Sequence, residues 1–150
     1  HLKKASITDV LTGLPNRQFF QQHMEDSFAQ SQRDKMPLSL ILLDLDKLKS
    51  INDQFGHEGG DIMLKLFSRI VQKHVRRNER PSRIGGEEFA MVMENTSPRE
   101  AQAVARRINT KVGECLSSGT WKEFLKEDPV EDKIIAEAIL KKLGLTVSAG

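Results

Sequence analysis

Arg83-Ile-Gly-Gly-Glu-Glu-Phe-Ala-Met-Val92 combines a short strand, a glycine pair, two acidic residues and a second apolar strand. Two adjacent glycines between apolar runs predict a tight β-hairpin, because such a turn needs positive φ angles that glycine adopts without strain. The glycines also carry no Cβ, so a bulky ligand could lie directly on the turn. Taken alone, the pattern indicates no more than a turn with a solvated acidic edge.

The composition is that of one domain with its own core. The chain has 150 residues, 38% of them hydrophobic, and its 23 basic residues nearly balance its 21 acidic residues. This balance gives no long-range field toward nucleic acid or membrane, so we expect neither as a partner of the domain. Cys115, the single cysteine, excludes an internal disulfide and a cysteine-rich zinc site. Because no apolar run reaches about 18 residues, we expect a cytoplasmic domain, although a longer parent protein could be membrane-anchored.

A second acidic cluster lies upstream, at the end of the apolar run from Leu38 to Asp46. Nearly unbroken apolar runs of this length predict a central strand covered on both faces. Asp44 and Asp46 stand two residues apart at its end, and strand side chains two apart point to the same face. Both carboxylates are therefore expected to reach one cleft.

The segments before and after this strand are expected to be mainly helical. Residues 1–8 are interpreted as a lead-in helix or linker end, and the Gly- and Pro-containing stretch from Asp9 to Arg17 as a wide turn. Asn16 is placed to cap the next helix. Four-residue spacing predicts that this helix buries Phe20, Met24 and Phe28.

After the strand, a short helical turn is expected over residues 47–52 and a loop over residues 55–60. Asp61 would cap or begin the next helix, whose apolar face carries Ile62, Met63, Leu66, Phe67, Ile70 and Val71.

The C-terminal half begins with a strong helix start signal. Ser97-Pro98-Arg99-Glu100 is a capping box with proline at the first helical position. Residues 120–143 predict two helical pieces broken at Pro129, and residues 145–150 a last strand. Strands interleaved with helices, one strand pair forming a hairpin, predict an α/β (α+β) fold with a mostly antiparallel sheet wrapped by helices.

Together, the two acidic clusters have the composition of a divalent cation site. Asp44, Asp46, Glu87 and Glu88 supply oxygen ligands from two chain segments, and Lys49 lies close in sequence. Magnesium favours a few carboxylates together with phosphate oxygens and water, which is how phosphoryl-transfer sites hold nucleotides.

At this point the chain resembles the GGDEF-domain family, the diguanylate cyclases that join two GTP into cyclic di-GMP, here with a GGEEF variant. The matching stretches are Asp9-Val-Leu-Thr-Gly-Leu-Pro-Asn-Arg17, Asp44-Leu-Asp46 with Lys49 and Ile51-Asn-Asp53, Phe55-Gly-His57, Gly60-Asp61, Arg83-Ile-Gly-Gly-Glu-Glu-Phe89 and Thr146-Val-Ser-Ala-Gly150. They occur in the family's order along the whole chain. Each stretch alone is weak evidence for the family, whereas all of them together in the family's order are specific to it.

The resemblance implies a palm-like nucleotidyl-cyclase fold over residues 9–150, and a further strand and helix would follow Gly150 in such a domain. It implies bound Mg²⁺, or Mn²⁺ in its place. The implied metal ligands are Asp44, the carbonyl of Leu45 and Glu87, and the resemblance also makes Glu87 the proton acceptor. The role of Glu88 stays open between a second metal ligand and an outward-facing residue. Asp46 is expected to have a structural role.

The resemblance also assigns the nucleotide contacts. Asn52 and Asp61 would bind the guanine edge, with His57 beside them. An amide together with a carboxylate can satisfy the donors and acceptor of guanine, whereas adenine offers no such donor pair. Lys49, counted with the catalytic groups, would meet the phosphates together with the backbone amides of Lys47 and Leu48, and Gly85 and Gly86 would let the nucleotide lie on the turn.

The implied partners are GTP, a second copy of the domain, and an N-terminal sensory or regulatory domain in the parent chain. Many family members carry an inhibitory product site, Arg-x-x-Asp, before the glycine pair. Here the register gives Arg76-Arg-Asn-Glu79, and the longer side chain of Glu79 predicts weakened product inhibition. The stretch 120–143 is longer than usual and is either a locally packed insertion or a partner surface.

Each candidate residue taken singly is also typical of a cap, a helix end or a solvated side chain. Two other functions therefore remain open: a non-catalytic module that binds GTP or cyclic di-GMP or dimerises, and a nucleotidyl cyclase or polymerase-like domain for another nucleotide.

Overall fold

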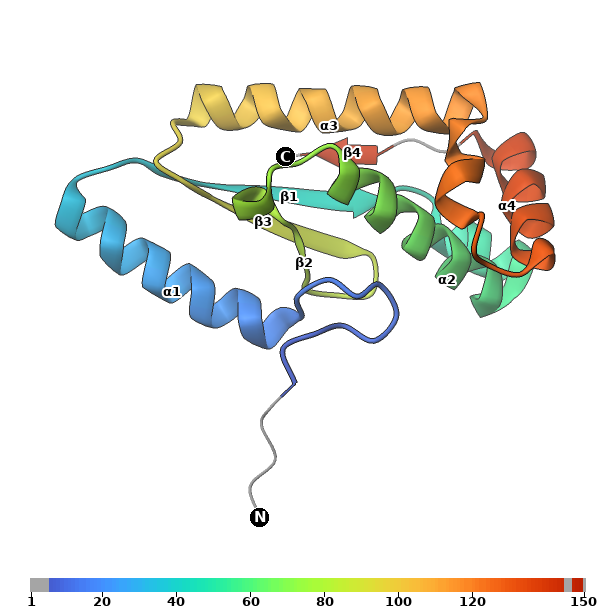
Figure 1. The fold of residues 1–150 in the computed structure, drawn as a ribbon, viewed down its shortest axis with the longest axis horizontal. Coiled ribbons are helices and arrows are strands. Elements are labelled where there is room, and N and C mark those ends of the chain that lie inside the picture. Colours follow the sequence, from blue (N-terminus) through green and yellow to red (C-terminus); the bar gives the residue numbers. More distant parts are fainter. Residues whose placement is uncertain (1–5, 145–146, 150) are drawn as a thin grey trace, which may run out of the picture.

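The computed structural model describes residues 6–144 and 147–149, which form one sheet packed against helices (Figure 1). The elements are, in order, α1 (Arg17–Asp34), β1 (Leu38–Leu45), α2 (Leu48–Lys73), η1 (Arg77–Glu79), β2 (Ser82–Arg83), β3 (Glu88–Glu94), α3 (Pro98–Ser118), η2 (Thr120–Leu125), α4 (Val130–Leu143) and β4 (Val147–Ala149). The strand order is β2-β3-β1-β4, and all three pairings are antiparallel. The predicted α+β class with a mostly antiparallel sheet is confirmed.

β1 runs through the interior of the sheet, but only one of its faces is fully covered. Ile41, Leu43 and Leu45 are at most 2% exposed, whereas Leu40 and Leu42 are 39% and 48% exposed. The prediction of cover on both faces is therefore wrong. On the less covered side α1 packs more over β2 and β3 than over β1, which leaves Leu40 and Leu42 exposed.

The buried face of the sheet packs against α2 and α3. The ring of Phe67 on α2 meets the ring of Phe89 on β3 edge-on, with 5.0 Å between the centroids. Ile108 and Val112 of α3 are buried, and Figure 1 shows α3 running along the sheet. The predicted apolar face of α2 is confirmed, because all six of its named residues are buried.

The predicted helix ends are largely confirmed. Asn16 caps α1 by accepting a hydrogen bond from the amide of Phe19 at 3.0 Å. Ser97 and Glu100 form the capping box of α3. Gly119 and Gly144 end α3 and α4 in the left-handed conformation that glycine tolerates.

Three local details differ from a sequence expectation. Of the two alternatives for residues 1–8, a helix does not include Ser6 to Thr8, since Thr8 forms a β-bridge with Pro15, and residues 1–5 lie outside the described residues. Phe28 of the predicted α1 stripe is 53% exposed, and Ser27 is buried instead, donating a hydrogen bond to Glu94 on β3. A short polar contact therefore replaces part of the expected apolar seam.

The third correction concerns the predicted loop at residues 55–60, which is helical. Two helical segments meet in α2 at Gly56, whose φ of 74° and ψ of 173° are not helical and produce a kink. Asp61 consequently lies within the helix and does not cap it. Within residues 6–144 and 147–149, every helix is too short or too polar to span a lipid bilayer.

Candidate active site

The end of β1 and the tip of the β2–β3 hairpin lie side by side. Asp44 is paired in register with Glu88, and the amide of Leu45 donates a hydrogen bond to the carbonyl of Glu87 at 3.2 Å. Antiparallel pairing places partner side chains on one face of a sheet, so Asp44 and Glu88 point to the same side. The fold therefore brings the two acidic clusters together, as the sequence predicts.

The hairpin is present, but its glycines do not have the predicted backbone conformation. β2 pairs with β3 at Ser82↔Ala90 and Arg83↔Phe89, and neither Gly85 nor Gly86 has a positive φ. The chain reverses over four residues, Ile84 to Glu87, so the turn is wide enough to form without a positive φ at Gly85 or Gly86. The carbonyl of Glu88 accepts hydrogen bonds from the amides of Ile84 and Gly85 at 2.9 and 3.3 Å, which closes the loop.

Gly86 leaves open space at the hairpin tip. A Cβ built on Gly86 meets no atom within 4 Å, whereas one on Gly85 would lie 3.5 Å from the Cβ of Glu88. The absence of side-chain bulk at Gly86, and not a left-handed φ, is what leaves room for a ligand on this turn.

Arg83 ties the hairpin to the N-terminal wide turn. Its guanidinium donates to the carbonyl of Gly86 through Nη2 at 2.9 Å and forms an ion pair with Asp9 at 3.2 Å. Asp9 in turn accepts hydrogen bonds from the amide and hydroxyl of Thr12 at 2.9 and 2.7 Å. Arg17 reaches the carbonyl of Ile84 at 3.4 Å. Residues next to Glu87 are thus held by groups about 70 positions away in the chain.

Asp9 and Arg83 have no predicted role beyond their place in matching stretches, so their pairing is a new observation. The only available signals were an acid at the start of a Gly- and Pro-containing turn and a base before a glycine pair. Nothing in a single sequence indicates that two such residues meet.

The carboxylates at the site repel one another. The pKa of Asp44 is raised by burial and by the negative charges of Asp46 and Glu88. The pKa of Glu87 is raised by burial and by Asp44, Glu88 and Asp46. In addition, Oδ1 of Asp44 is buried without a hydrogen-bond partner among the described residues. A cation placed among these groups would relieve both the repulsion and the unsatisfied oxygen.

The donor chemistry fits a hard divalent cation, although the side chains are not already gathered around one point. Asp44, Glu87 and Glu88 offer carboxylate oxygens and Leu45 a backbone carbonyl, the ligand types that Mg²⁺ and Mn²⁺ prefer. Across residues 6–144 and 147–149, no three His, Cys, Asp or Glu side chains form a ready-made metal cluster. Phosphate oxygens and water would have to complete the coordination, as is usual for magnesium.

The other candidate residues lie on or beside α2, which starts directly after the acidic strand end. Lys47 precedes the helix in a left-handed conformation, and Lys49 is exposed in its first turn. The free amides of a first helical turn favour anions such as phosphate. Asn52 follows one turn later.

The kink brings Asn52 against Gly60. A Cβ on Gly60 would overlap Oδ1 of Asn52, and this oxygen is buried without a hydrogen-bond partner in the described chain. Asp61 adjoins Gly60 and is exposed, and His57 follows the kink, also exposed. The structure therefore places Asn52 against Gly60, the neighbour of Asp61, and leaves His57 and Asp61 exposed one helical turn apart.

The predicted product-site residues lie away from these groups, at η1. The carboxylate of Glu79 accepts a hydrogen bond from the amide of Arg76 at 3.2 Å and pairs with Arg107 of α3 at 3.4 Å. Glu79 therefore already has two partners. A polar cavity of 480 Å³ adjoins it, lined in part by Arg76, Arg107 and Glu100.

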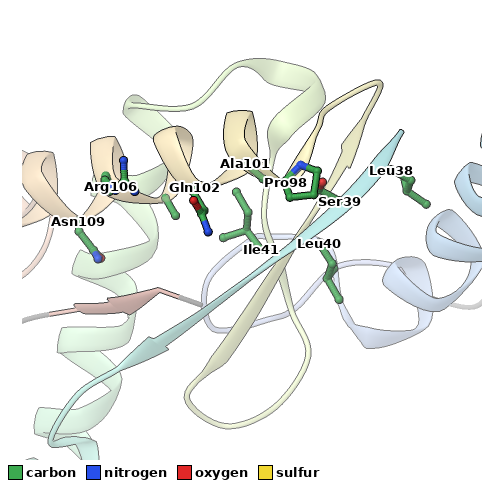
Figure 2. A pocket seen from close by; sticks show the side chains of 10 residues that line it. Leu38, Ser39, Leu40, Ile41, Pro98, Ala101, Gln102, Arg106 and Asn109 are labelled. Carbon is green, nitrogen blue, oxygen red and sulfur yellow. The ribbon is translucent and has the colours of Figure 1, made fainter. Parts of the chain in front are cut away.

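A cavity of 590 Å³ lies on another part of the molecule, between α3 and the first half of β1 (Figure 2). Ile41, Gln102 and Arg106 line it. It contains none of the candidate residues, so its size alone does not mark it as the active site.

Comparison with known proteins agrees with this geometry. Residues 6–122 match the family model described as diguanylate cyclase, GGDEF domain. Diguanylate cyclase DgcS of Shewanella oneidensis is 42% identical over 89 residues, which cover 59% of this chain and 30% of the relative. Diguanylate cyclase DgcP of Pseudomonas aeruginosa is 36% identical over 113 residues, which cover 75% of this chain and 17% of the relative.

Among solved structures, the active GGEEF domain of a diguanylate cyclase from Vibrio cholerae matches with a TM-score of 0.61 at 37% identity, covering 66% of this chain and 64% of that one. The chain thus spans less than a third of the length of the two curated relatives named above. The family model covers well over half of the chain, and its motifs occupy the acidic strand end and the hairpin tip. The chain therefore belongs to the diguanylate cyclase GGDEF-domain family.

Proposed function

We propose that this chain is the catalytic domain of a diguanylate cyclase that condenses two GTP into cyclic di-GMP and releases two pyrophosphates. The observation that carries the proposal is the junction of the acidic strand end with the hairpin tip, where Asp44 is paired with Glu88 and Leu45 is hydrogen-bonded to Glu87. Shared negative charge at this junction supports a site for a cation and a triphosphate.

The chemistry consists of two equivalent phosphoryl transfers. In each, the 3′-oxygen of one GTP bonds to the α-phosphorus of the other, and the bond from that phosphorus to the β-phosphate bridging oxygen breaks. Pyrophosphate carries away the bonding electrons, and the 3′-hydroxyl proton passes to a base. Glu87 is our candidate for that base, as the family resemblance implies, and its place at the hairpin tip beside the end of β1 supports this role.

Asp44, the carbonyl of Leu45, Glu87 and, as an open alternative, Glu88 would hold Mg²⁺ or Mn²⁺. The bound ion would supply positive charge to the α-phosphate and lower the pKa of the attacking hydroxyl. The residues themselves contribute position: β1 and the hairpin fix the carboxylates on rigid strands, and Arg83 holds the loop beside Glu87.

The nucleotide would extend from the hairpin to α2. Lys49 and the backbone amides of Lys47 and Leu48 would bind phosphate oxygens at the start of the helix. Asn52 and Asp61 would select guanine, with His57 beside them. Gly85 and Gly86 would carry the nucleotide on the uncluttered hairpin tip.

One domain holds one GTP in this scheme, so two copies must face each other for both transfers. A homodimer is therefore the expected active form, and a regulatory domain elsewhere in the parent chain would control its assembly.

The direct test is to incubate concentrated protein with GTP and Mg²⁺ and to separate the products. Cyclic di-GMP and two equivalents of pyrophosphate are expected, with a rate per domain that rises with protein concentration. Formation of pyrophosphate with a different nucleotide product would instead support another nucleotidyltransferase.

One observation favours a second candidate, a non-catalytic module that binds GTP or cyclic di-GMP. The carboxylates of the described residues are not gathered into a ready metal cluster. Tight binding of Mg²⁺–GTP with no cyclic dinucleotide at any protein concentration would establish this alternative.

A further inference from the structure

α4 lies outside the stretch that the family model matches, which ends at Lys122. It nevertheless packs along α2, the helix that carries the proposed nucleotide ligands (Figure 1). Ala136 and Ile139 on its inner face are completely buried. The helix is thus a structural addition with a defined docking surface within this same chain.

The apolar part of this contact falls just after the kink in α2. A Cβ on Gly59 would lie 3.4 Å from Cδ1 of Ile139 and only 2.6 Å from Cβ of Phe55. Ile139 therefore lies over Gly59 at van der Waals range, while the atom that a Cβ at Gly59 would overlap is Cβ of Phe55. The terminal methyl of Ile139 rests three residues beyond Gly56, whose φ of 74° produces the kink.

Polar contacts at two places, one on each side of the kink, hold the ends of the segment that contains α4. Before α2 begins, the ammonium of Lys47 donates to the carbonyl of Leu143, the last residue of α4, at 2.6 Å. In the second half of α2, Arg69 forms an ion pair with Asp128 at 2.7 Å and donates to the carbonyl of Phe124 at 2.8 Å. The segment 124–143 therefore spans α2 from one half to the other.

A helix with a non-helical residue inside can bend at that residue unless neighbouring structure fixes it. Here the two halves of α2 carry different candidate ligands: Lys49 and Asn52 precede Gly56, and His57 and Asp61 follow it. The angle at the kink consequently sets the distance between the phosphate end and part of the guanine end of the site.

We infer that the segment 124–143, which includes α4, is a brace that fixes the kink of α2, and that Ile139 and Arg69 are positioning residues for nucleotide binding through this brace. The inference rests on the proposed function for its consequence, GTP affinity, but not for its mechanical part. It assigns residues 120–143 a role within the domain instead of a role as a partner surface.

The chain offers a closely matched pair of variants for the test. Ile139→Val removes the terminal methyl that rests on Gly59, and Ile108→Val removes the same group from an equally buried isoleucine on α3. Arg69→Met loosens the far end of the brace at a partly exposed residue, without altering the core. The readouts are amide hydrogen exchange across residues 55–62 and calorimetric binding of a GTP analogue with a methylene bridge between its α and β phosphorus atoms, in Mg²⁺.

We expect Ile139→Val and Arg69→Met to accelerate exchange at residues 55–62 and to weaken analogue binding by about three- to tenfold, with Ile108→Val close to wild type. If Ile139→Val and Ile108→Val change exchange at the kink equally, or if neither brace variant changes it, the brace is refuted. If wild-type protein binds no guanosine nucleotide, the proposed function fails, and the exchange comparison still decides the mechanical inference.

Discussion

The hairpin and the kinked helix lie next to the same strand end, but they are held in different ways. The hairpin is fixed by charge and hydrogen bonds, through Arg83, Asp9 and the carbonyl of Gly86. The kink of α2 is packed against the apolar side chain of Ile139, and polar contacts hold the segment 124–143 to α2 on either side of the kink. Hydrogen bonds depend on the direction of donor and acceptor, whereas apolar packing sets how closely two elements approach. Substitutions in the two regions should therefore change the enzyme kinetics in different ways.

The largest effect is expected at the hairpin. Glu87→Ala removes the proposed base and metal ligand, and turnover should fall by at least about a thousandfold. The melting temperature should not fall, because this side chain contributes no apolar packing. Product formation under saturating GTP and Mg²⁺ measures the effect, with Glu127→Ala on the exposed surface as the control. Wild-type turnover in Glu87→Ala would remove the hairpin from the mechanism.

The next effect tests the anchor behind the hairpin. Asp9→Asn and Arg83→Lys should each lower kcat by about tenfold with little change in KM, because loop position and not nucleotide contact is altered. Each should also cost about 1–2 kcal/mol of unfolding free energy. The double variant should lose much less than the sum, since both changes break one pair. Additive losses would show that the two residues act independently.

A smaller effect is expected at Glu79 of η1, another residue that is held by polar contacts. Calorimetry should show weak binding of cyclic di-GMP to the wild-type protein, because Glu79 is engaged by Arg76 and Arg107. Glu79→Asp should tighten this binding by about three- to tenfold. Submicromolar wild-type binding that disappears in Arg76→Ala would contradict the expectation.

The smallest effect concerns pH. The pKa of Glu87 is raised in the folded protein, so the folded state holds this proton more tightly than the unfolded state. The stabilisation is present below the ordinary glutamate pKa and is lost as pH rises through the raised value. Glu87→Gln should therefore give a small rise in melting temperature at pH 7 and none near pH 3. Equal shifts at both values would argue against carboxylate repulsion.

Bound metal should also stabilise the wild-type protein, because it offsets the same negative charge. Adding Mg²⁺ with the GTP analogue should raise the melting temperature of the wild-type protein more than that of Glu87→Gln, since bound cation neutralises the repulsion.

Much of the fold could be predicted because its signals are local. The capping box at Ser97, the break at Pro129 and the apolar run of β1 each specify an element without reference to distant residues. The convergence of Asp44 with the hairpin could also be expected, since the resemblance makes Asp44 and Glu87 ligands of one metal ion.

The remaining features depend on contacts between distant segments. The three glycines within residues 55–60 predict a loop, yet Gly59 and Gly60 serve close packing within a helix. The Asp9–Arg83 pair is invisible in a sequence read alone. For the same reason, the packing of residues 120–143 on α2 could not be foreseen.

The uneven cover of β1 has a practical consequence for enzymology. Leu40 and Leu42, on the less covered face of β1, are 39% and 48% exposed and add apolar surface there. Exposed apolar patches promote association between molecules. Concentrating the protein to favour productive face-to-face pairs would thus also favour dead-end ones, and sedimentation measured alongside turnover would separate the two populations.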